Sequence, residues 1–478
     1  MTGVKTILPE AYLPARVPLS VWRQSGWITL DRRTGFREGC LTEAKGADPR
    51  TLPALCTSPC PRRTAHTPIA GKPHTLQVIG GEIYAVSNVD GEDILFRTRR
   101  GEWQSLSLGT AHAGVPRRIL PYTHSTDPFD TSRDFPMVML FPDGFYVRPD
   151  RDEMQLYKIN QWPDTEMPYL SDACAHLSRV FGVGGMFAYA SQHNDILRWK
   201  FDTEDSVSAA HAWVTASQSG STTSAADFTA IVPFSGMLLA FKERICQQIG
   251  GNKNPFRIAD LLAVGTSDKR TVAHVGPYLI FADRHEVYRF DGSDVREIGA
   301  PLAAPDLSGA IAATADGLYY LYVPTLGRVF TYAYETGAWC ELYPFSERPV
   351  AAMASVQDGG VLFIDEGGEL YATAEAEELP FSIETTPIVP NLPAPSRLLR
   401  LRLTFLAEAG AELTVSCRLS DGELVPLCTV TGDGRTQRKS LRIPAAADTA
   451  ASLCFAGHGK VHVKALDLVT AETAHDGT

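Results

Sequence analysis

Six aspartates could supply acid–base chemistry, because they recur close to the starts of strand-rich segments: Asp143, Asp195, Asp227, Asp283, Asp316 and Asp365. A glycosidase needs two or three carboxylates that converge on one sugar bond. Nearly all of these aspartates, however, lie in or beside turns, where Asp is favoured because its side chain bonds the local backbone. We therefore expect turn residues rather than catalytic acids, and no hydrolytic activity.

Other catalytic patterns are missing from the sequence. His193 and His285 have no plausible nucleophile beside them, and there is no GxSxG motif. The chain has no P-loop and no dinucleotide fingerprint. The glycine-rich stretch FGVGG (181–185) leads into an expected strand rather than a helix, which argues against a phosphate cradle. The sequence thus predicts no catalytic residue and no cofactor.

The nine cysteines are an odd number scattered along the chain. One combination, Cys40, Cys56, Cys60 and His66, could be considered for zinc, but its spacing matches no zinc pattern well. We expect reduced, mostly buried thiols and no metal.

A repeated unit must position all of these residues. A glycine or Asp-Gly turn precedes an apolar or aromatic strand, and a polar turn and a second strand follow. The glycines that mark the units stand at positions 81, 144, 185, 236, 276, 317 and 360. A period of about 40–50 residues with four strands per unit is typical of propeller blades. Seven blades are expected; six or eight stay open, because the first interval is long and the other end of the chain could complete the first blade.

The aromatic residues at the strand centres are expected to stack between blades, so Phe281, Tyr288 and Tyr320 should be buried. No signature of a known propeller family accompanies the repeat. The stretch YLSDACAHLSRVFG (169–182) has a Ser-Asp start and apolar spacing, which predicts at most one short helix.

The expected fold class is all-β, a propeller followed by a small β-sandwich. Residues 1–66 are rich in Pro, Arg and Thr and predict an extended N-terminal arm, followed by the propeller at 67–382. A Pro-rich linker is expected at 383–397 and the sandwich at 398–470. In RLLRLR (397–402) arginines alternate with leucines, which predicts a strand with one solvent face.

Net charge and hydropathy limit the kinds of partner that the chain can have. The formal net charge is −11 and the pI about 5.6, so a basic footprint over the whole fold is absent. No apolar run is long enough to span a bilayer, and the start of the chain has no pattern of a secretory signal. We expect a protein made in a cytoplasm, with no membrane partner.

Part of the sequence resembles a virion protein of tailed bacteriophages, found in phages and prophages of low-GC Gram-positive hosts. The resemblance rests on three motifs in order, CAHLSRVFGVGGMFAYAS (174–191), DFTAIVPFSGMLLAFKERICQQIGG (227–251) and VGPYLIFADRHEVYRFDG (275–292). In the first two motifs the matching positions are Arg179, Gly182, Tyr189, Ala190, Ser191, Phe228, Thr229, Gly236, Leu239, Phe241, Lys242, Glu243 and Gly250. The chain departs from the family where Phe181 replaces a Trp, and in the N-terminal arm, where the family's Tyr is absent.

The overall plan is also similar to the head-closure proteins of short-tailed phages, which stabilise packaged DNA. These resemblances imply a ring-forming structural subunit at the neck or tail of a virion, assembled in the host cytoplasm. The implied partners are other copies of the chain, neighbouring virion proteins and, in passing, packaged DNA, which an acidic subunit would repel rather than hold. The alternative is a carbohydrate-binding or glycosidase-like propeller that contacts the host surface.

The N-terminal arm is the expected partner contact. It holds large aromatic residues that would be costly to leave exposed, and a pair of arginines: Tyr12, Trp22, Trp27, Arg62 and Arg63.

Overall fold

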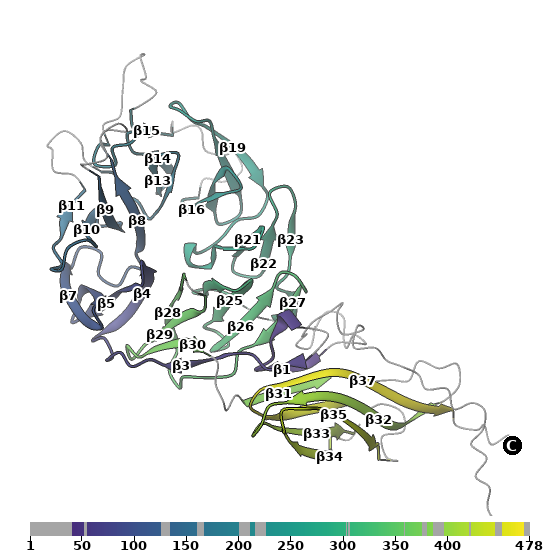
Figure 1. Ribbon diagram of the computed structural model, residues 1–478. Coiled ribbons are helices and arrows are strands. Elements are labelled where there is room, and N and C mark those ends of the chain that lie inside the picture. Colours follow the sequence, from purple (N-terminus) through teal and green to yellow (C-terminus); the bar gives the residue numbers. More distant parts are fainter. Residues whose placement is uncertain are drawn as a thin grey trace, which may run out of the picture.

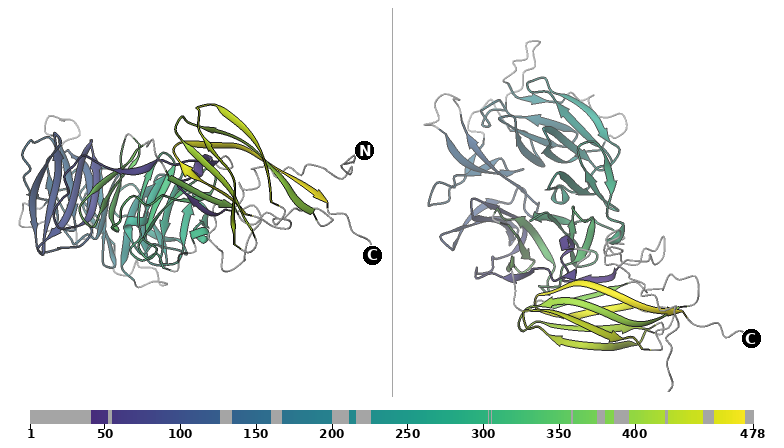
Figure 2. Two further views of the ribbon diagram at one scale, coloured as in Figure 1. Left: turned by 90° about the horizontal axis from the view of Figure 1, so that it is seen from below. Right: turned by 45° about the vertical axis from the view of Figure 1, so that its right-hand side comes forward.

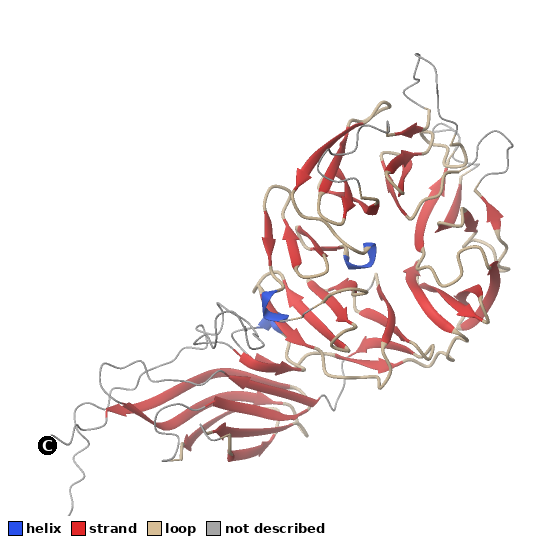
Figure 3. Ribbon diagram, turned by 180° about the vertical axis from the view of Figure 1, so that it is seen from behind, coloured by secondary structure: helices blue, strands red, loops and turns tan. Residues whose placement is uncertain are grey.

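The computed structural model describes residues 41–51, 55–125, 134–159, 167–199, 211–215, 226–302, 304, 306–357, 359–374, 380–385, 396–419, 422–444 and 452–472. Within these ranges the chain is almost entirely β-structure, a ring of small sheets with a second β domain attached at one side (Figure 1). Short helical turns are the sole helical elements in the described ranges (Figure 3). None of the described helices is long and apolar enough to cross a membrane.

The ring is a propeller of seven four-stranded antiparallel blades. The first three blades comprise β4 (Lys72–Ile79), β5 (Glu82–Val89), β6 (Glu92–Arg99) and β7 (Glu102–Gly109); β8 (Arg118–His124), β9 (Phe135–Phe141), β10 (Phe145–Val147) and β11 (Tyr157–Lys158); and β12 (Asp172–His176), β13 (Arg179–Gly184), β14 (Phe187–Ala190) and β15 (Trp213–Val214). The next three comprise β16 (Phe228–Phe234), β17 (Met237–Lys242), β18 (Cys246–Gly250) and β19 (Arg257–Leu262); β20 (Ala273–Val275), β21 (Tyr278–Ala282), β22 (Val287–Phe290) and β23 (Val295–Glu297); and β24 (Ile311–Ala315), β25 (Leu318–Val323), β26 (Arg328–Ala333) and β27 (Ala338–Glu341).

The seventh blade is completed by the amino-terminal part of the chain. It takes β28 (Val350–Ser355), β29 (Val361–Asp365) and β30 (Leu370–Ala374) from the end of the repeat, and its outermost strand is β3 (Cys60–Arg63). A three-stranded blade would expose the unpaired backbone groups of β30, and β3 covers them. The expectation of seven blades is confirmed, but the blade completed from the other end of the chain is the last one, not the first.

Apolar clusters lie between neighbouring blades, as the repeat predicted. Phe281 and Tyr288 belong to the cluster between blades four and five, and Tyr320 to the one between blades six and seven. All three are buried, with 0%, 8% and 5% of their surface exposed. A blade is too small to bury both faces alone, so this stacking supplies the core of the ring.

The glycine turns also follow the prediction. All seven glycines that marked the units have a positive φ, between 56° and 94°. Residues with a side chain rarely adopt this conformation, which explains why glycine recurs at these tight turns. Five of the turns join the first and second strands of a blade, whereas those at Gly144 and Gly185 join the second and third.

The second domain is a β-sandwich. One of its sheets contains β31 (Pro380–Thr385), β36 (Ser452–His458), β33 (Glu412–Arg418) and β34 (Leu424–Thr431). The other contains β2 (Leu55–Cys56), β37 (Val461–Glu472), β32 (Ser396–Ala407) and β35 (Thr436–Arg442). Figure 2 shows the sandwich packed beside one part of the ring, away from its centre.

The amino-terminal segment joins the two domains. β1 (Leu41–Lys45) pairs antiparallel with β31, and Lys45 lies opposite Glu341 of β27, so one continuous sheet runs from blade six into the sandwich. A single apolar cluster also extends from blades five and six into the sandwich core. Gly46 follows β1 with φ +69°, and a Cβ there would lie 2.6 Å from the carbonyl oxygen of Pro380. The propeller and the sandwich therefore form one body.

Three expectations need correction. Residues 41–51 and 55–63 are not an arm, because β1, β2 and β3 pair within three sheets of their own chain. The sandwich begins earlier than 398, since β31 occupies part of the expected linker; residues 386–395 lie outside the described ranges. The expected helix at 169–182 is a β-hairpin of β12 and β13, whose two-residue turn, Leu177 and Ser178, has positive φ at both positions.

Candidate functional site

The six aspartates considered for catalysis are spread over six different blades, and most of them bond their own surroundings. Asp143 accepts hydrogen bonds from Arg117, and Asp195 forms an ion pair with Arg198 at 3.1 Å. Asp227 is exposed. No two of them converge on a common point.

The remaining three occupy turns, as the sequence predicted. Asp283 accepts from the backbone N–H groups of residues 285 and 286, both at 2.7 Å. Asp316 occupies a turn with φ 50°. Asp365 accepts from the N–H groups of residues 367 and 369 at 2.9 and 3.0 Å. His193 and His285 are exposed.

The cysteines considered for zinc do not assemble with other ligands in the described ranges. Cys56 lies on β2 and Cys60 on β3, both half-buried, while Cys40 lies outside the described residues. No group of three His, Cys, Asp or Glu side chains suited to a metal occurs in the part of the chain that the structure describes. Burial raises the pKa of both Cys56 and Cys60, so both thiols stay protonated at neutral pH.

The expected partner residues are only partly placed. Tyr12, Trp22 and Trp27 lie outside the described residues. Arg62 and Arg63 are exposed on β3 at the rim of blade seven, and Arg63 forms an ion pair with Glu369. These arginines belong to a blade rather than to a free arm.

Two positions of the motifs that carry the resemblance, Arg179 and Thr229, form hydrogen bonds within the fold. Arg179 is buried and donates to the carbonyl oxygens of Ser191 and His211 at 2.5 and 2.8 Å. The Thr229 hydroxyl donates to the carbonyl oxygen of Thr266 at 2.7 Å. The resemblance in this segment thus falls on residues that build the fold.

The central channel holds a polar site. A cavity of about 390 Å³ lies among the innermost strands of five blades. Its cationic and imidazole lining comes from His74, Arg117, Arg118, Lys269, Arg270 and His274. No Asp or Glu lines this cavity, although the chain as a whole is acidic. The carboxylates lie behind the cations, in the wall.

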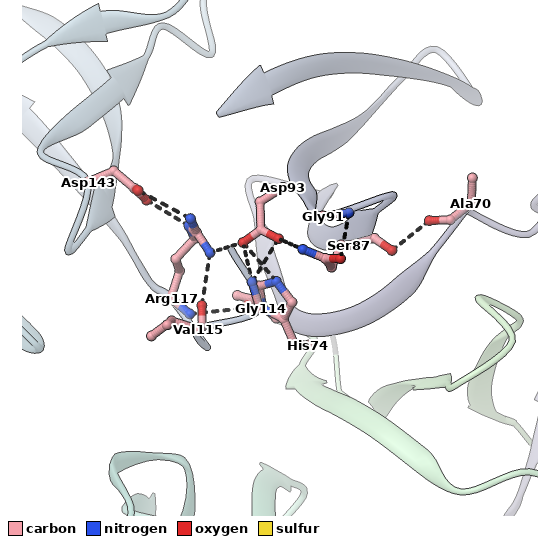
Figure 4. A network of polar contacts seen from close by, with 11 residues as sticks. Ala70, His74, Ser87, Gly91, Asp93, Gly114, Val115, Arg117 and Asp143 are labelled. Atoms are coloured by element: carbon pink, nitrogen blue, oxygen red, sulfur yellow. Dashed lines mark hydrogen bonds and ion pairs between the residues drawn. The ribbon is translucent and has the colours of Figure 1, made fainter. Parts of the chain in front are cut away.

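Blades one and two share a buried network (Figure 4). The Arg117 guanidinium is fully buried and bridges Asp93 and Asp143, donating to Asp143 Oδ2 at 2.7 Å. His74 Nε2 lies 3.1 Å from the same Asp93. Burial lowers the pKa of His74 in spite of this carboxylate, so the imidazole is neutral at pH 7. Hydrogen bonds within the network satisfy its buried polar groups, and the network positions the first strands of two blades.

A second network extends to blades three, four and five. The fully buried Asp172 accepts Arg118 Nε at 2.6 Å and Nη2 at 3.2 Å, and also the backbone N–H of Ile231 at 2.9 Å. Between blades four and five a short 3-10 turn, η4 (Lys269–Thr271), is capped by Asp268. Asp268 also accepts Arg270 Nε and Nη2, at 3.0 and 2.6 Å.

Lys269 differs from its cationic neighbours. Its Nζ donates to the carbonyl oxygen of Ser171 at 2.5 Å, and it has no carboxylate within ion-pair distance in the described ranges. Burial lowers the pKa of its ammonium group to about 8, although Asp172 and Asp268 favour the charge. Lys269 is half-buried, and a cation partly removed from solvent without its own counter-ion is costly unless something else stabilises it.

A second cationic feature lies on the outer face of the sandwich. Arg400 and Arg402 of β32 are exposed and flank the buried Leu401, which confirms the predicted solvent face. Arg400 lies directly opposite Arg442 of β35, which is also exposed. Like charges in directly opposed positions of a sheet destabilise it.

The sequence did not point to the channel cations. Arg117 and Lys269 stand far apart in the chain, and each is adjacent to a second basic residue, as exposed surface charges often are. The available signal was position, since both pairs stand where the chain enters an innermost strand.

No family model and no curated protein sequence matches this chain. Among solved structures, a catalytically inactive virginiamycin B lyase from Staphylococcus aureus with quinupristin is 10% identical, covering 65% of this chain and 97% of that one, with a TM-score of 0.43. The WD40 propeller domain of Doa1 is 10% identical, with coverages of 67% and 97% and a TM-score of 0.40. The extracellular domain of a putative one-component system from B. thetaiotaomicron is 11% identical, with coverages of 87% and 64% and a TM-score of 0.44. One of these structures is that of an enzyme, but at these sequence identities and TM-scores the similarity says nothing about what this chain binds or catalyses.

Proposed function

We propose that the protein is a structural subunit of a tailed-bacteriophage particle, a ring-forming neck or tail component that binds other copies of itself and neighbouring virion proteins around the DNA path. The observation that supports this proposal most is the exposed arginine face of the sandwich, defined by Arg400, Arg402, Arg438 and Arg442.

The register places all four side chains on one side of the sheet. Arg400 lies opposite Arg442, and Arg438 lies opposite Thr404, two positions beyond Arg402. None of the four forms an ion pair with another described side chain. Since neighbouring strands lie about 5 Å apart, repulsion between Arg400 and Arg442 disfavours the isolated subunit, whereas Arg402 lies opposite Asp467 of β37. An anionic partner surface would relieve it.

The composition of the chain suggests where such a surface comes from. Residues 396–472 contain ten Lys and Arg against eight Asp and Glu, whereas the whole chain contains 44 against 55. The acidic excess therefore resides outside the sandwich. A contact between the arginine face of one copy and an acidic propeller of the next is heterologous, and repetition of such a contact closes a ring when its rotation permits. Complementary charge would steer the encounter and fix the register.

The rigid join between the domains suits this role. Because β1 and β2 tie the propeller to the sandwich, force on one domain is transmitted to the other rather than absorbed by a hinge. The acidic balance of the chain as a whole favours passage of DNA over its retention.

The alternative, a glycosidase-like propeller, would need carboxylates that converge in the channel. The cavity there is lined by cations instead, and five of the six candidate aspartates lie in turns or ion pairs. We propose no hydrolytic role.

Self-association of the purified full-length chain tests the proposal. Light scattering at low and high salt should show assemblies larger than the monomer that dissociate as salt rises. The double variant Arg400→Glu/Arg442→Glu should stay monomeric and folded. A control with the same change of charge on blade four, Lys253→Glu/Arg257→Glu, should assemble as the wild type does. Equal assembly by both variants would contradict a contact through the arginine face.

A further inference from the structure

We propose that the central channel binds a small oxyanion, a ligand bearing a phosphate or carboxylate group, held between Arg118, Lys269 and Arg270. This inference is independent of the proposed structural role, which concerns the outer surfaces.

Arg118 and Arg270 each leave the Nη1 side of the guanidinium group unoccupied. Arg118 uses Nε and Nη2 on Asp172, and Arg270 uses Nε and Nη2 on Asp268. Each contact is side-on, so in the described structure both Nη1 groups keep their N–H donors without a protein acceptor. The side chains of Arg118 and Arg270 are 32% and 29% exposed, and both line the cavity. A fixed guanidinium with a free edge is suited to planar or tetrahedral oxyanions.

Lys269 supplies the net charge of the site. The carboxylates of Asp172 and Asp268 offset the two arginines, whereas Lys269 has one carbonyl acceptor and no ion pair of its own in the described ranges. An anion in front of it would provide the missing counter-charge and accept its remaining N–H donors. Preorganised donors of this kind bind anions without a large change of structure.

The remaining lining argues for an anion over other ligands. No carboxylate lines the cavity, so a metal cation or an amine would find no anionic ligand there, and the described residues hold no group of three His, Cys, Asp or Glu side chains suited to a metal. Burial lowers the pKa of both His74 and His274, which therefore add neutral polar groups at pH 7. A volume of about 390 Å³ exceeds that of a single phosphate and admits a diphosphate or a small organic acid.

The charge state of Lys269 gives the site a pH dependence. The groups that face its ammonium are Asp172 of β12, Arg118 of β8, and Asp268 and Arg270 of the η4 turn. Because the pKa of Lys269 is about 8 in the absence of a ligand, affinity for an anion should fall as the pH rises above this value.

Calorimetric titration of the full chain with sodium phosphate, pyrophosphate and citrate tests the site, with sodium chloride at equal ionic strength as reference. We expect saturable binding at pH 7 that weakens toward pH 9.5. Lys269→Met should lose at least about tenfold in affinity, the loss expected when a charged hydrogen bond is removed. Lys253→Met, an exposed lysine of blade four, should bind as the wild type does. Tighter binding of pyrophosphate than citrate would identify a phosphate ligand, and the reverse order a carboxylate ligand.

A chemical measurement on the wild type guards against a variant that does not fold. Pyrophosphate should slow the reductive methylation of Lys269, followed by peptide mass spectrometry, and leave that of Lys253 unchanged. The proposal is overturned if none of the three anions binds saturably, if Lys269→Met binds as tightly as the wild type, or if pyrophosphate gives Lys269 no protection.

Discussion

Replacement of Phe281 by alanine should destabilise the propeller strongly. The ring is fully buried between blades four and five and lies 4.9 Å from the ring of Phe241 and 5.5 Å from that of Tyr288, measured between centroids. Truncation removes the apolar contacts of a phenyl group and leaves a cavity that two rigid sheets cannot close. Such substitutions cost about 3–5 kcal/mol in free energy of unfolding, a large part of the roughly 5–15 kcal/mol that stabilises a typical domain.

Equilibrium unfolding in urea, followed by tryptophan fluorescence, measures this loss as a lower midpoint at unchanged slope. Tyr169→Ala is the matched control, because this aromatic side chain is 54% exposed, and it should change stability by no more than about 0.5 kcal/mol. Tyr320→Ala acts in a different cluster, so its effect should add to that of Phe281→Ala within about 0.5 kcal/mol. A cost for Phe281→Ala no larger than that of Tyr169→Ala would refute the stacked-blade core.

Three further predictions follow from other parts of the structure. Deletion of residues 2–63 should open blade seven and separate the sandwich from the propeller, which would lower the melting temperature and speed proteolysis. Deletion of residues 2–40 should leave a folded chain that fails to enter particles. Equal stability of the two truncated chains would argue against the closing role of β3. Lys269→Met should be more stable than the wild type at neutral pH. The pKa of Lys269 is about 8 in the folded chain and 10.5 for an ordinary lysine, so the wild type should become more stable as the pH rises through this range. The difference in the free energy of unfolding in urea should therefore shrink from pH 8 to 10.5. Asp143→Asn should lower the melting temperature, because it disrupts the ion pair with buried Arg117. Wild type and variant alike should release reducing sugar from bacterial wall polysaccharide only at background level. Sugar release by the wild type that the substitution abolishes would support the glycosidase alternative.

The repeating part of the fold could be predicted because its signals are local. A positive φ, as at Gly276 and Gly317, favours glycine whatever the rest of the chain does, and the alternation around Leu401 indicates one buried and one exposed face. Asp283 was correctly assigned to a turn for the same reason, since its acceptors serve N–H groups two and three residues ahead.

The closure of the ring and the channel could not be predicted, because both depend on contacts between distant segments. β3 has the sequence CPRR and no alternation of its own, and it is a strand because β30 offers a free edge. The hairpin at 172–184 has apolar spacing compatible with a helix, but it forms two strands because their backbones pair across the turn. The donors of Arg118 and Lys269 are aimed by Asp172 and Ser171 from another blade, a relation absent from any local motif.

The central claim is that the protein occupies a fixed place in a virion. Electron microscopy of particles purified from lysates of the producing cells, with a gold label on a tag fused to the carboxyl terminus, tests it most directly. The proposal predicts label at the neck or tail of every particle, in a constant number of copies. Particles without label, with the protein recovered as a monomer in the soluble fraction, would contradict it.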